Sequence, residues 1–187
     1  MLHDHSAEEG TYFAALESLF LDATDEHDLF ETIVNAPFHN PIFSTSIDLG
    51  VVVLLLVNKK TKTIDRIALS NTPQAHGAVK MSEKPFSAIK IPVGYKGNII
   101  AESIDTGTSH HTSDWQYLFM PALSMQAARF NQAGAGIECS YVYPLVGARD
   151  GGALIFSYYQ PRANIKTRHR NFMQFYSQLV AHKIATF

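Results

Sequence analysis

Histidine and carboxylate side chains stand close together in one short polar stretch of the sequence. His110 and His111 are followed by Asp114, and imidazole and carboxylate groups are both common metal ligands. Adjacent side chains in a stretch rich in Ser and Thr, however, rarely converge on one ion. We therefore expect either a solvated loop or a local helix-capping role for Asp114, and no metal site.

Aromatic, thioether and basic side chains follow this stretch. Trp115, Tyr117 and Phe119 are large side chains that suit a cavity for an apolar or planar ligand, and Met125 adds an adaptable thioether. Arg129 could hold a carboxylate or phosphate through two parallel hydrogen bonds. The alternatives are ordinary core packing for the aromatic residues and a surface position for Arg129.

The chain has a single cysteine, Cys139. It has no basic neighbour in the sequence that would activate its thiol, so we expect it to pack as a small hydrophobic residue. One thiol cannot form an internal disulfide or a multi-thiolate metal site, which agrees with a reducing compartment. The candidate ligand-binding residues are Trp115, Tyr117, Phe119, Met125, Arg129, Cys139 and Tyr141.

The remaining chemical signals in the sequence are weak. The segment from Gly94 to Asn98 precedes a predicted helix, where free backbone amides attract anions and Lys96 could assist. We favour a simple helix entry, because no strand with a P-loop pattern leads into it. The sequence also contains no G-x-S-x-G elbow and no H-E-x-x-H motif. We expect no catalytic residue, no cofactor and no enzymatic activity.

The composition is that of a globular protein of one domain. Of 187 residues, 46% are hydrophobic and 11% aromatic, and the formal net charge is −2 without a basic stripe, so nucleic acid is not an expected partner. The longest apolar run, 49–57, is too short to span a membrane, and the polar N-terminus is unlike a signal peptide. We expect a cytoplasmic protein with a flexible segment at 1–10 and a domain at 11–187.

Hydrophobic periodicity indicates the elements that must position these side chains. Strands are predicted at 50–57 and 64–69, followed by a looser segment that contains three prolines. A closing hairpin is predicted around the turn at 149–152. Helices are predicted at 11–20, around 29–34, at 98–107, from Pro121 to about 133, and at 165–185.

Five segments in the second half of the sequence resemble the GAF domain family. They are GNIIAESIDTG, SDW, YPLV, GGALIFSYY and HRNFMQFYSQLVAHKIA. The resemblance implies an α+β fold with a central antiparallel sheet of about five to six strands. It further implies that the N- and C-terminal helices pack on one face, while short helices and loops roof a ligand pocket on the other.

Diagnostic residues of several GAF subgroups are missing. Free methionine sulfoxide reductases work through several cysteines, and this chain has one. Bilin-binding members commonly carry a histidine after the attachment cysteine, whereas Ser140 follows Cys139. Cyclic-nucleotide-binding members carry Asn-Lys followed later by Asp-Glu, but here Asp25-Glu26 precedes Asn58-Lys59. None of these three activities is therefore expected.

Three functions remain open at this point. The first is a sensor whose small-molecule ligand fills the pocket and alters the packing of the terminal helices. The second is an interaction module that forms homodimers through these helices, with a vestigial pocket. Its predicted interface residues are Leu16, Phe20, Phe172 and Leu179. The third is an unrecognised enzyme that uses His111, Arg129 or Cys139.

Overall fold

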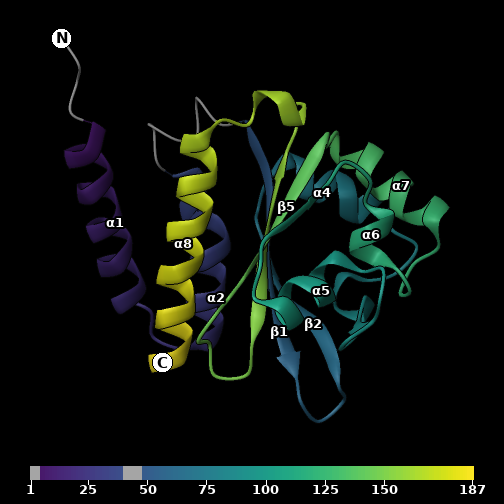
Figure 1. The fold of residues 1–187 in the computed structure, drawn as a ribbon, viewed down its shortest axis with the longest axis horizontal. Coiled ribbons are helices and arrows are strands. Elements are labelled where there is room, and N and C mark those ends of the chain that lie inside the picture. Colours follow the sequence, from purple (N-terminus) through teal and green to yellow (C-terminus); the bar gives the residue numbers. More distant parts are fainter. Residues whose placement is uncertain (1–4, 40–47) are drawn as a thin grey trace.

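Six antiparallel strands form one sheet at the centre of the computed structural model, which describes residues 5–39 and 48–187 (Figure 1). The strands are β1 (Leu49–Asn58), β2 (Thr63–Leu69), β3 (Ile91–Pro92), β4 (His110–Thr112), β5 (Cys139–Pro144) and β6 (Gly152–Tyr158). Their order across the sheet is β3-β2-β1-β6-β5-β4. The expected α+β class and the antiparallel sheet of five to six strands are therefore confirmed.

The two strands of the closing hairpin are neighbours at the centre of the sheet. β5 and β6 run antiparallel, with Tyr143 opposite Leu154, and β6 also pairs antiparallel with β1. β6 is buried along its whole length, which explains the apolar run without alternation in its sequence. The turn before it contains Gly151 at φ +84°, a backbone conformation that glycine adopts without a steric penalty.

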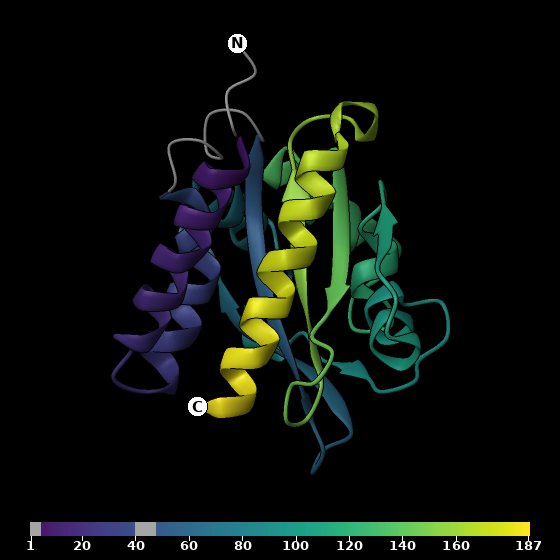
Figure 2. The ribbon, with the colours of Figure 1, turned by 60° about the vertical axis from the view of Figure 1, so that its left-hand side comes forward.

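Three helices cover one face of the sheet (Figures 1 and 2). They are α1 (His5–Leu21), α2 (Glu26–Asn35) and α8 (Thr167–Thr186). The buried rings of Phe20, Phe156 and Tyr176 lie in the core between these helices and the sheet. The Tyr176 hydroxyl donates a hydrogen bond to the Ile33 carbonyl oxygen at 2.6 Å and so joins α8 to α2. The expected layer of N- and C-terminal helices is present.

Short helices cover the opposite face, as the resemblance implied. They are α4 (Pro73–Lys80), α5 (Ile99–Thr106), α6 (Gln116–Phe119) and α7 (Met125–Ala135), together with the 3-10 turn η2 (Phe86–Ala88). The predicted start at Asn98 and the predicted end at Gly107 are both present in α5. The Asn98 side chain caps α5 by accepting from the Ile100 amide at 2.9 Å, and Gly107 ends it at φ +67°. The Gly97 amide donates to the Glu102 carboxylate at 3.0 Å, so the segment before α5 is a helix entry.

Two predicted loops are regular elements in the structure. The segment after β2 was expected to be irregular, but Thr72 accepts from the Ala75 amide at 3.2 Å and Pro73 occupies the first turn of α4. A proline in that position is compatible with a helix, because the amide it lacks would have no helical partner. The stretch 110–112 was expected to be a loop, but it forms β4 through pairing with β5.

Helix boundaries also differ from their predictions. Pro121 was expected in a first helical turn, but it lies between α6 and α7, and α7 begins after its cap, Ser124. α1 begins at His5, within the segment 1–10 that was expected to be flexible; residues 1–4 of that segment lie outside the described residues. Within residues 5–39 and 48–187, no helix is both long and apolar enough to cross a membrane.

Candidate ligand cavity

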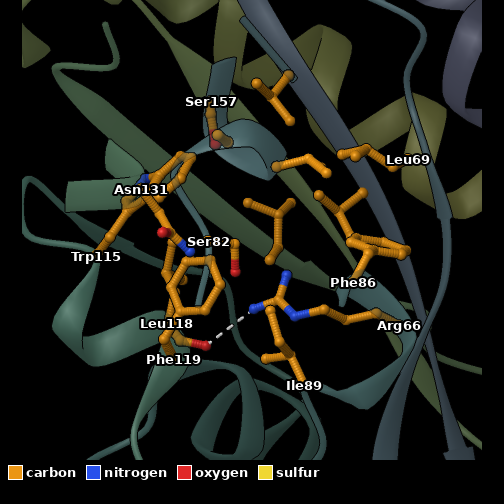
Figure 3. A pocket seen from close by; sticks show the side chains of 15 residues that line it. Arg66, Leu69, Ser82, Phe86, Ile89, Trp115, Leu118, Phe119, Asn131 and Ser157 are labelled. Carbon is orange, nitrogen blue, oxygen red and sulfur yellow. Dashed lines mark hydrogen bonds between the residues drawn. The ribbon is translucent and has the colours of Figure 1, made fainter. Parts of the chain in front are cut away.

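A cavity lies between the sheet and the short helices that cover it (Figure 3). It offers about 40 Å³ of room to water-sized molecules. Its apolar wall includes Val51, Val53, Leu69, Phe86, Ile89 and Ile155. Its polar side chains are Arg66, Ser82, Asn131 and Ser157. An apolar lining with a few polar groups is typical of sites for small organic molecules, but this chamber is much smaller than most such sites.

A β-bulge in β2 places Arg66 in this cavity. Leu55 of β1 pairs with Arg66 and Leu54 pairs with Ala68, so Ile67 is an extra residue without a partner. Because of this insertion, Arg66 and Leu69 both line the cavity although they are three residues apart. Ala68 turns to the core under the terminal helices.

Arg66 is buried without a compensating acid. Its side chain is 6% exposed, and none of the ion pairs between described residues involves it. Nη2 donates to the Leu118 carbonyl oxygen at 3.3 Å, whereas the buried Nε has no hydrogen-bond partner within residues 5–39 and 48–187. The guanidinium carbon lies 4.3 Å from the centroid of the Phe119 ring. Figure 3 shows the guanidinium pointing into the cavity between Ile89 and Phe119.

Burial lowers the pKa of the Arg66 guanidinium. Desolvation lowers the pKa of Arg66 well below its ordinary value, to about 9, because a low-dielectric surrounding disfavours the charged form of a base. One carbonyl and one aromatic face compensate the charge only in part. The folded protein therefore keeps an under-compensated cation in an otherwise apolar chamber.

Two serines and the single tryptophan form a hydrogen-bonded chain beside the cavity. Trp115 Nε1 donates to Ser140 Oγ at 2.8 Å, and Ser140 Oγ lies 2.7 Å from Ser157 Oγ. All three side chains are buried. This chain satisfies polar atoms that would otherwise be costly to bury and fixes the orientation of the indole.

The wall formed by α4 and α7 is closely packed. A Cβ atom on Gly77 would lie 2.1 Å from the Gly134 carbonyl oxygen, so the two helix backbones approach as closely as they do only because both residues are glycine. Asn131 joins the same helices: its amide donates to the Met81 carbonyl oxygen at 3.0 Å and accepts from Ser82 Oγ at 3.3 Å. The cavity thus has a rigid wall on this side.

The structure places two of the seven predicted ligand-binding residues in the cavity wall. These are Trp115 and Phe119. Tyr117 and Met125 are 44% and 49% exposed and do not line it. At least one or two of the aromatic and thioether candidates were expected to face a cavity, and Trp115 and Phe119 do. These two residues are four apart and therefore share one face of the helical turn, whereas Tyr117 between them lies on the other face.

Arg129 is on the surface and is paired with an acid. Its Nη2 and Nε donate to Asp114 Oδ2 at 2.6 and 3.0 Å, so the clamp predicted for a ligand holds a carboxylate of the chain itself. Asp114 Oδ1 also accepts from the Gln116 amide at 3.0 Å, a local contact at the start of α6, although the N-cap residue of that helix is Trp115. Among the described residues, no group of three or more His, Cys, Asp or Glu could hold a metal ion.

Cys139 and Tyr141 lie on the other face of the sheet. Both belong to the core beneath the terminal helices, whereas Ser140 and Val142 alternate with them toward the cavity side. Burial raises the pKa of the Cys139 thiol to about 11. Cys139 therefore packs as the small hydrophobic residue that the sequence indicated, and its thiol is poorly suited to act as a nucleophile.

Arg66 was not among the predicted site residues, although the sequence carries a signal for it. In the predicted strand 64–69, Ile64 and Arg66 have the same parity, so a strand with Ile64 in the core must also turn Arg66 inward. Long arginine side chains usually reach solvent from such positions. Only the tertiary structure shows that this one does not.

The arrangement of the sheet, helices and cavity has counterparts among solved structures. The GAF domain of a phosphoenolpyruvate-protein phosphotransferase from Acinetobacter has a TM-score of 0.65 at 10% identity, covering 96% of this chain and 93% of that chain. The corresponding domain from Coxiella burnetii has a TM-score of 0.64 at 9% identity, covering 94% and 92%. The chain therefore has the fold of a GAF domain.

A third similar structure belongs to an enzyme. It is the free methionine-R-sulfoxide reductase from Neisseria meningitidis in complex with its substrate, with a TM-score of 0.60 at 13% identity, covering 98% of this chain and 92% of that chain. No family model and no curated protein matches the sequence. At such low identity the similarity defines the fold, and function must be argued from the site.

Proposed function

We propose that this protein is a non-catalytic sensor domain that binds a small molecule in the cavity beside Arg66. The observation that carries the proposal is a buried cationic side chain that points into an apolar chamber and has no acidic partner among the described residues. Buried charges are normally paired, and an unpaired one is costly unless a ligand completes it. Similar solved structures from a methyl-accepting chemotaxis protein and from the GAF domain of a cyanobacteriochrome support the same class of function.

The side chains around the cavity favour binding over catalysis. Ser157 shares a short hydrogen bond with Ser140, and Ser82 bonds to Asn131 and to the Lys84 carbonyl oxygen. Neither serine has a histidine or carboxylate in the cavity wall to activate it. Cys139 faces the opposite core. A reaction would thus lack a prepared nucleophile among the residues that line this cavity.

The central strand β6 connects the cavity to the terminal helices. Ile155 and Ser157 line the cavity. The alternating residues Phe156 and Tyr158 point to the other face of the sheet and pack in the core beneath the terminal helices. The Phe156 ring lies 6.1 Å from that of Tyr176 in α8. A ligand that displaces β6 slightly would therefore change the packing of α8, which is a direct route for a signal.

A thermal-shift screen against a metabolite library tests the proposed function. A compound that binds only the folded state raises the melting temperature, and this rise should disappear in Ala78→Leu, which extends a side chain of the cavity wall into the chamber. Ala133→Leu, on the exposed side of α7, is the matched control and should retain it. A broad library without a stabilising compound, or hits unaffected by Ala78→Leu, would contradict the proposal.

Homodimerisation through the terminal helices is the second candidate function. Leu16, Phe20 and Phe172 were predicted as interface residues but are buried within the single chain. Phe175 of α8 is the better candidate, since it is 53% exposed and its ring lies 6.1 Å from that of Phe13 in α1. Phe175→Glu should convert a dimer into a soluble monomer in light scattering. An unchanged mass, or a monomeric unmodified protein, would exclude this interface.

A further inference from the structure

Resting on the proposed function, we infer that the ligand is a small monocarboxylic acid whose carboxylate pairs with Arg66 and whose apolar body fills the chamber. The groups that the cavity presents indicate this chemical class. Three properties of the cavity matter: the sign of its charge, the number of its hydrogen-bond donors without a partner among the described residues, and its size.

The charge in the cavity requires an anion. Among the described residues that line the cavity, Arg66 is the only ionisable side chain. Its face is covered by the Phe119 ring at 4.3 Å, so the N–H donors at its rim are the groups left to receive a ligand. A carboxylate is planar and matches the planar guanidinium fork, which adds directional hydrogen bonds to the charge pairing.

The number of spare donors favours a carboxylate over a phosphate. The Trp115 indole, the Ser157 hydroxyl and the Asn131 amide are all engaged with protein partners. Spare donor capacity therefore lies with Arg66, whose Nε is unpartnered and whose Nη2 gives one bond to Leu118. A phosphate brings more charge and three strong acceptor oxygens, and several of these would stay unsatisfied in this chamber. A carboxylate has two oxygens, which one guanidinium can hold.

The size and lining of the space limit the rest of the ligand. The room for water-sized molecules is about 40 Å³, far below the volume of a pocket for a drug-sized compound. Val53, Leu69 and Ile155 form an apolar wall, which rewards the burial of methyl and methylene groups. A short branched or straight aliphatic acid satisfies both conditions, and a second charged group would have no partner.

Isothermal titration calorimetry with matched probes tests the inference. The probes are sodium isobutyrate, the uncharged isobutyramide of the same shape, and methyl phosphate. We expect isobutyrate to bind the full chain at least about tenfold more tightly than isobutyramide, because only the acid pairs with the guanidinium. Arg66→Met should lose this binding. Arg129→Met, which removes a surface arginine paired with Asp114, should retain it.

The outcomes separate the ligand class from the proposed function. If isobutyramide binds as well as isobutyrate, or methyl phosphate binds more tightly, the monocarboxylate inference is wrong while a ligand-binding cavity remains. If no probe binds but the library yields a hit that Ala78→Leu abolishes, the inference again fails alone. Arg66→Lys provides a second variant should Arg66→Met not fold, because it keeps the positive charge but lacks the planar guanidinium that can hold both carboxylate oxygens. It should bind isobutyrate at least about tenfold more weakly than the unmodified protein.

Discussion

The guanidinium of Arg66 lies over the ring of Phe119, with 4.3 Å between its carbon and the ring centroid. A strand residue and a residue of the short helix α6 are thereby joined across the cavity. The contact offsets part of the cost of burying the cation, and it leaves the edge of the guanidinium for other partners. There, Nη2 donates a hydrogen bond to the Leu118 carbonyl oxygen.

Replacing Arg66 with an apolar residue should stabilise the ligand-free protein. Arg66→Met removes a buried charge without an acidic partner and keeps a side chain of similar length. Such replacements are worth about 1 to 4 kcal/mol, and we expect a gain in this range in the free energy of unfolding by urea. The exposed Arg129→Met should stay within about 0.5 kcal/mol. A clear loss of stability in Arg66→Met would show that the arginine is a structural element.

The difference in the free energy of unfolding between the unmodified protein and Arg66→Met should depend on pH. Burial lowers the pKa of Arg66 to about 9 in the folded protein, whereas the unfolded chain keeps the ordinary, much higher pKa of a solvated arginine. Between these two values the unfolded chain therefore binds more protons. Stability therefore rises with pH in this window, as the cost of the buried charge is relieved. Urea unfolding at pH 8 and about pH 10.5 should show the gap between unmodified protein and Arg66→Met shrinking. A constant gap would contradict the depressed pKa.

Carboxylate binding should follow the charge of Arg66 as well. Above a pH of about 9, the free guanidinium loses its proton, and the affinity for isobutyrate should fall by up to about tenfold per pH unit. Below that pH, and above the pKa of the acid itself, the affinity should be constant. Calorimetry across this range provides the measurement. An affinity that does not change through pH 10 would mean that the charge of Arg66 is not what holds the ligand.

A methyl group at the contact between α4 and α7 should destabilise the cavity wall. Gly77→Ala would place its Cβ 2.1 Å from the Gly134 carbonyl oxygen, so the two helices must separate. Overpacking of this kind costs about 1 to 3 kcal/mol, measured by urea unfolding. The same substitution at Gly10, which meets no atom within 4 Å in α1, should instead be neutral or stabilise by about 0.5 to 1 kcal/mol. Equal effects at the two sites would refute the close contact.

Cys139 should be unreactive in the folded protein. Its thiol is buried and its pKa is raised to about 11, so very little thiolate exists near neutral pH. At pH 8 we expect a thiol reagent such as 5,5′-dithiobis(2-nitrobenzoic acid) to react at least about a hundredfold more slowly than with the urea-unfolded chain. Rapid modification of the native protein would reopen the possibility of a catalytic cysteine.

Much of the fold could be predicted from local sequence signals. The run before Gly151 and the run after it predicted antiparallel neighbours, and Asn98 and Gly107 predicted the ends of α5. These signals act over a few residues, so they can be recognised in the sequence without tertiary information. Helix α4 was not predicted, because a proline such as Pro73 can either interrupt a helix or occupy its first turn.

The candidate site was harder to predict, because it depends on contacts between distant segments. The cluster of aromatic residues at 115–119 was visible in the sequence, and two of its members, Trp115 and Phe119, line the cavity. The sequence could not show that Arg129 would pair with Asp114, fifteen residues away. It also could not show that the bulge at Ile67 would combine Arg66 and Leu69 in one wall. Both results require knowledge of which segments meet in space.

The fluorescence of Trp115 is the most direct test of a ligand beside Arg66. Trp115 is the only tryptophan in the chain, is 4% exposed and lines the cavity, so its emission reports on this chamber alone. We predict a saturable change in emission when isobutyrate is added to the unmodified protein and to Arg129→Met, and none with Arg66→Met. A flat titration of the unmodified protein, or the same change in Arg66→Met, would contradict the central claim.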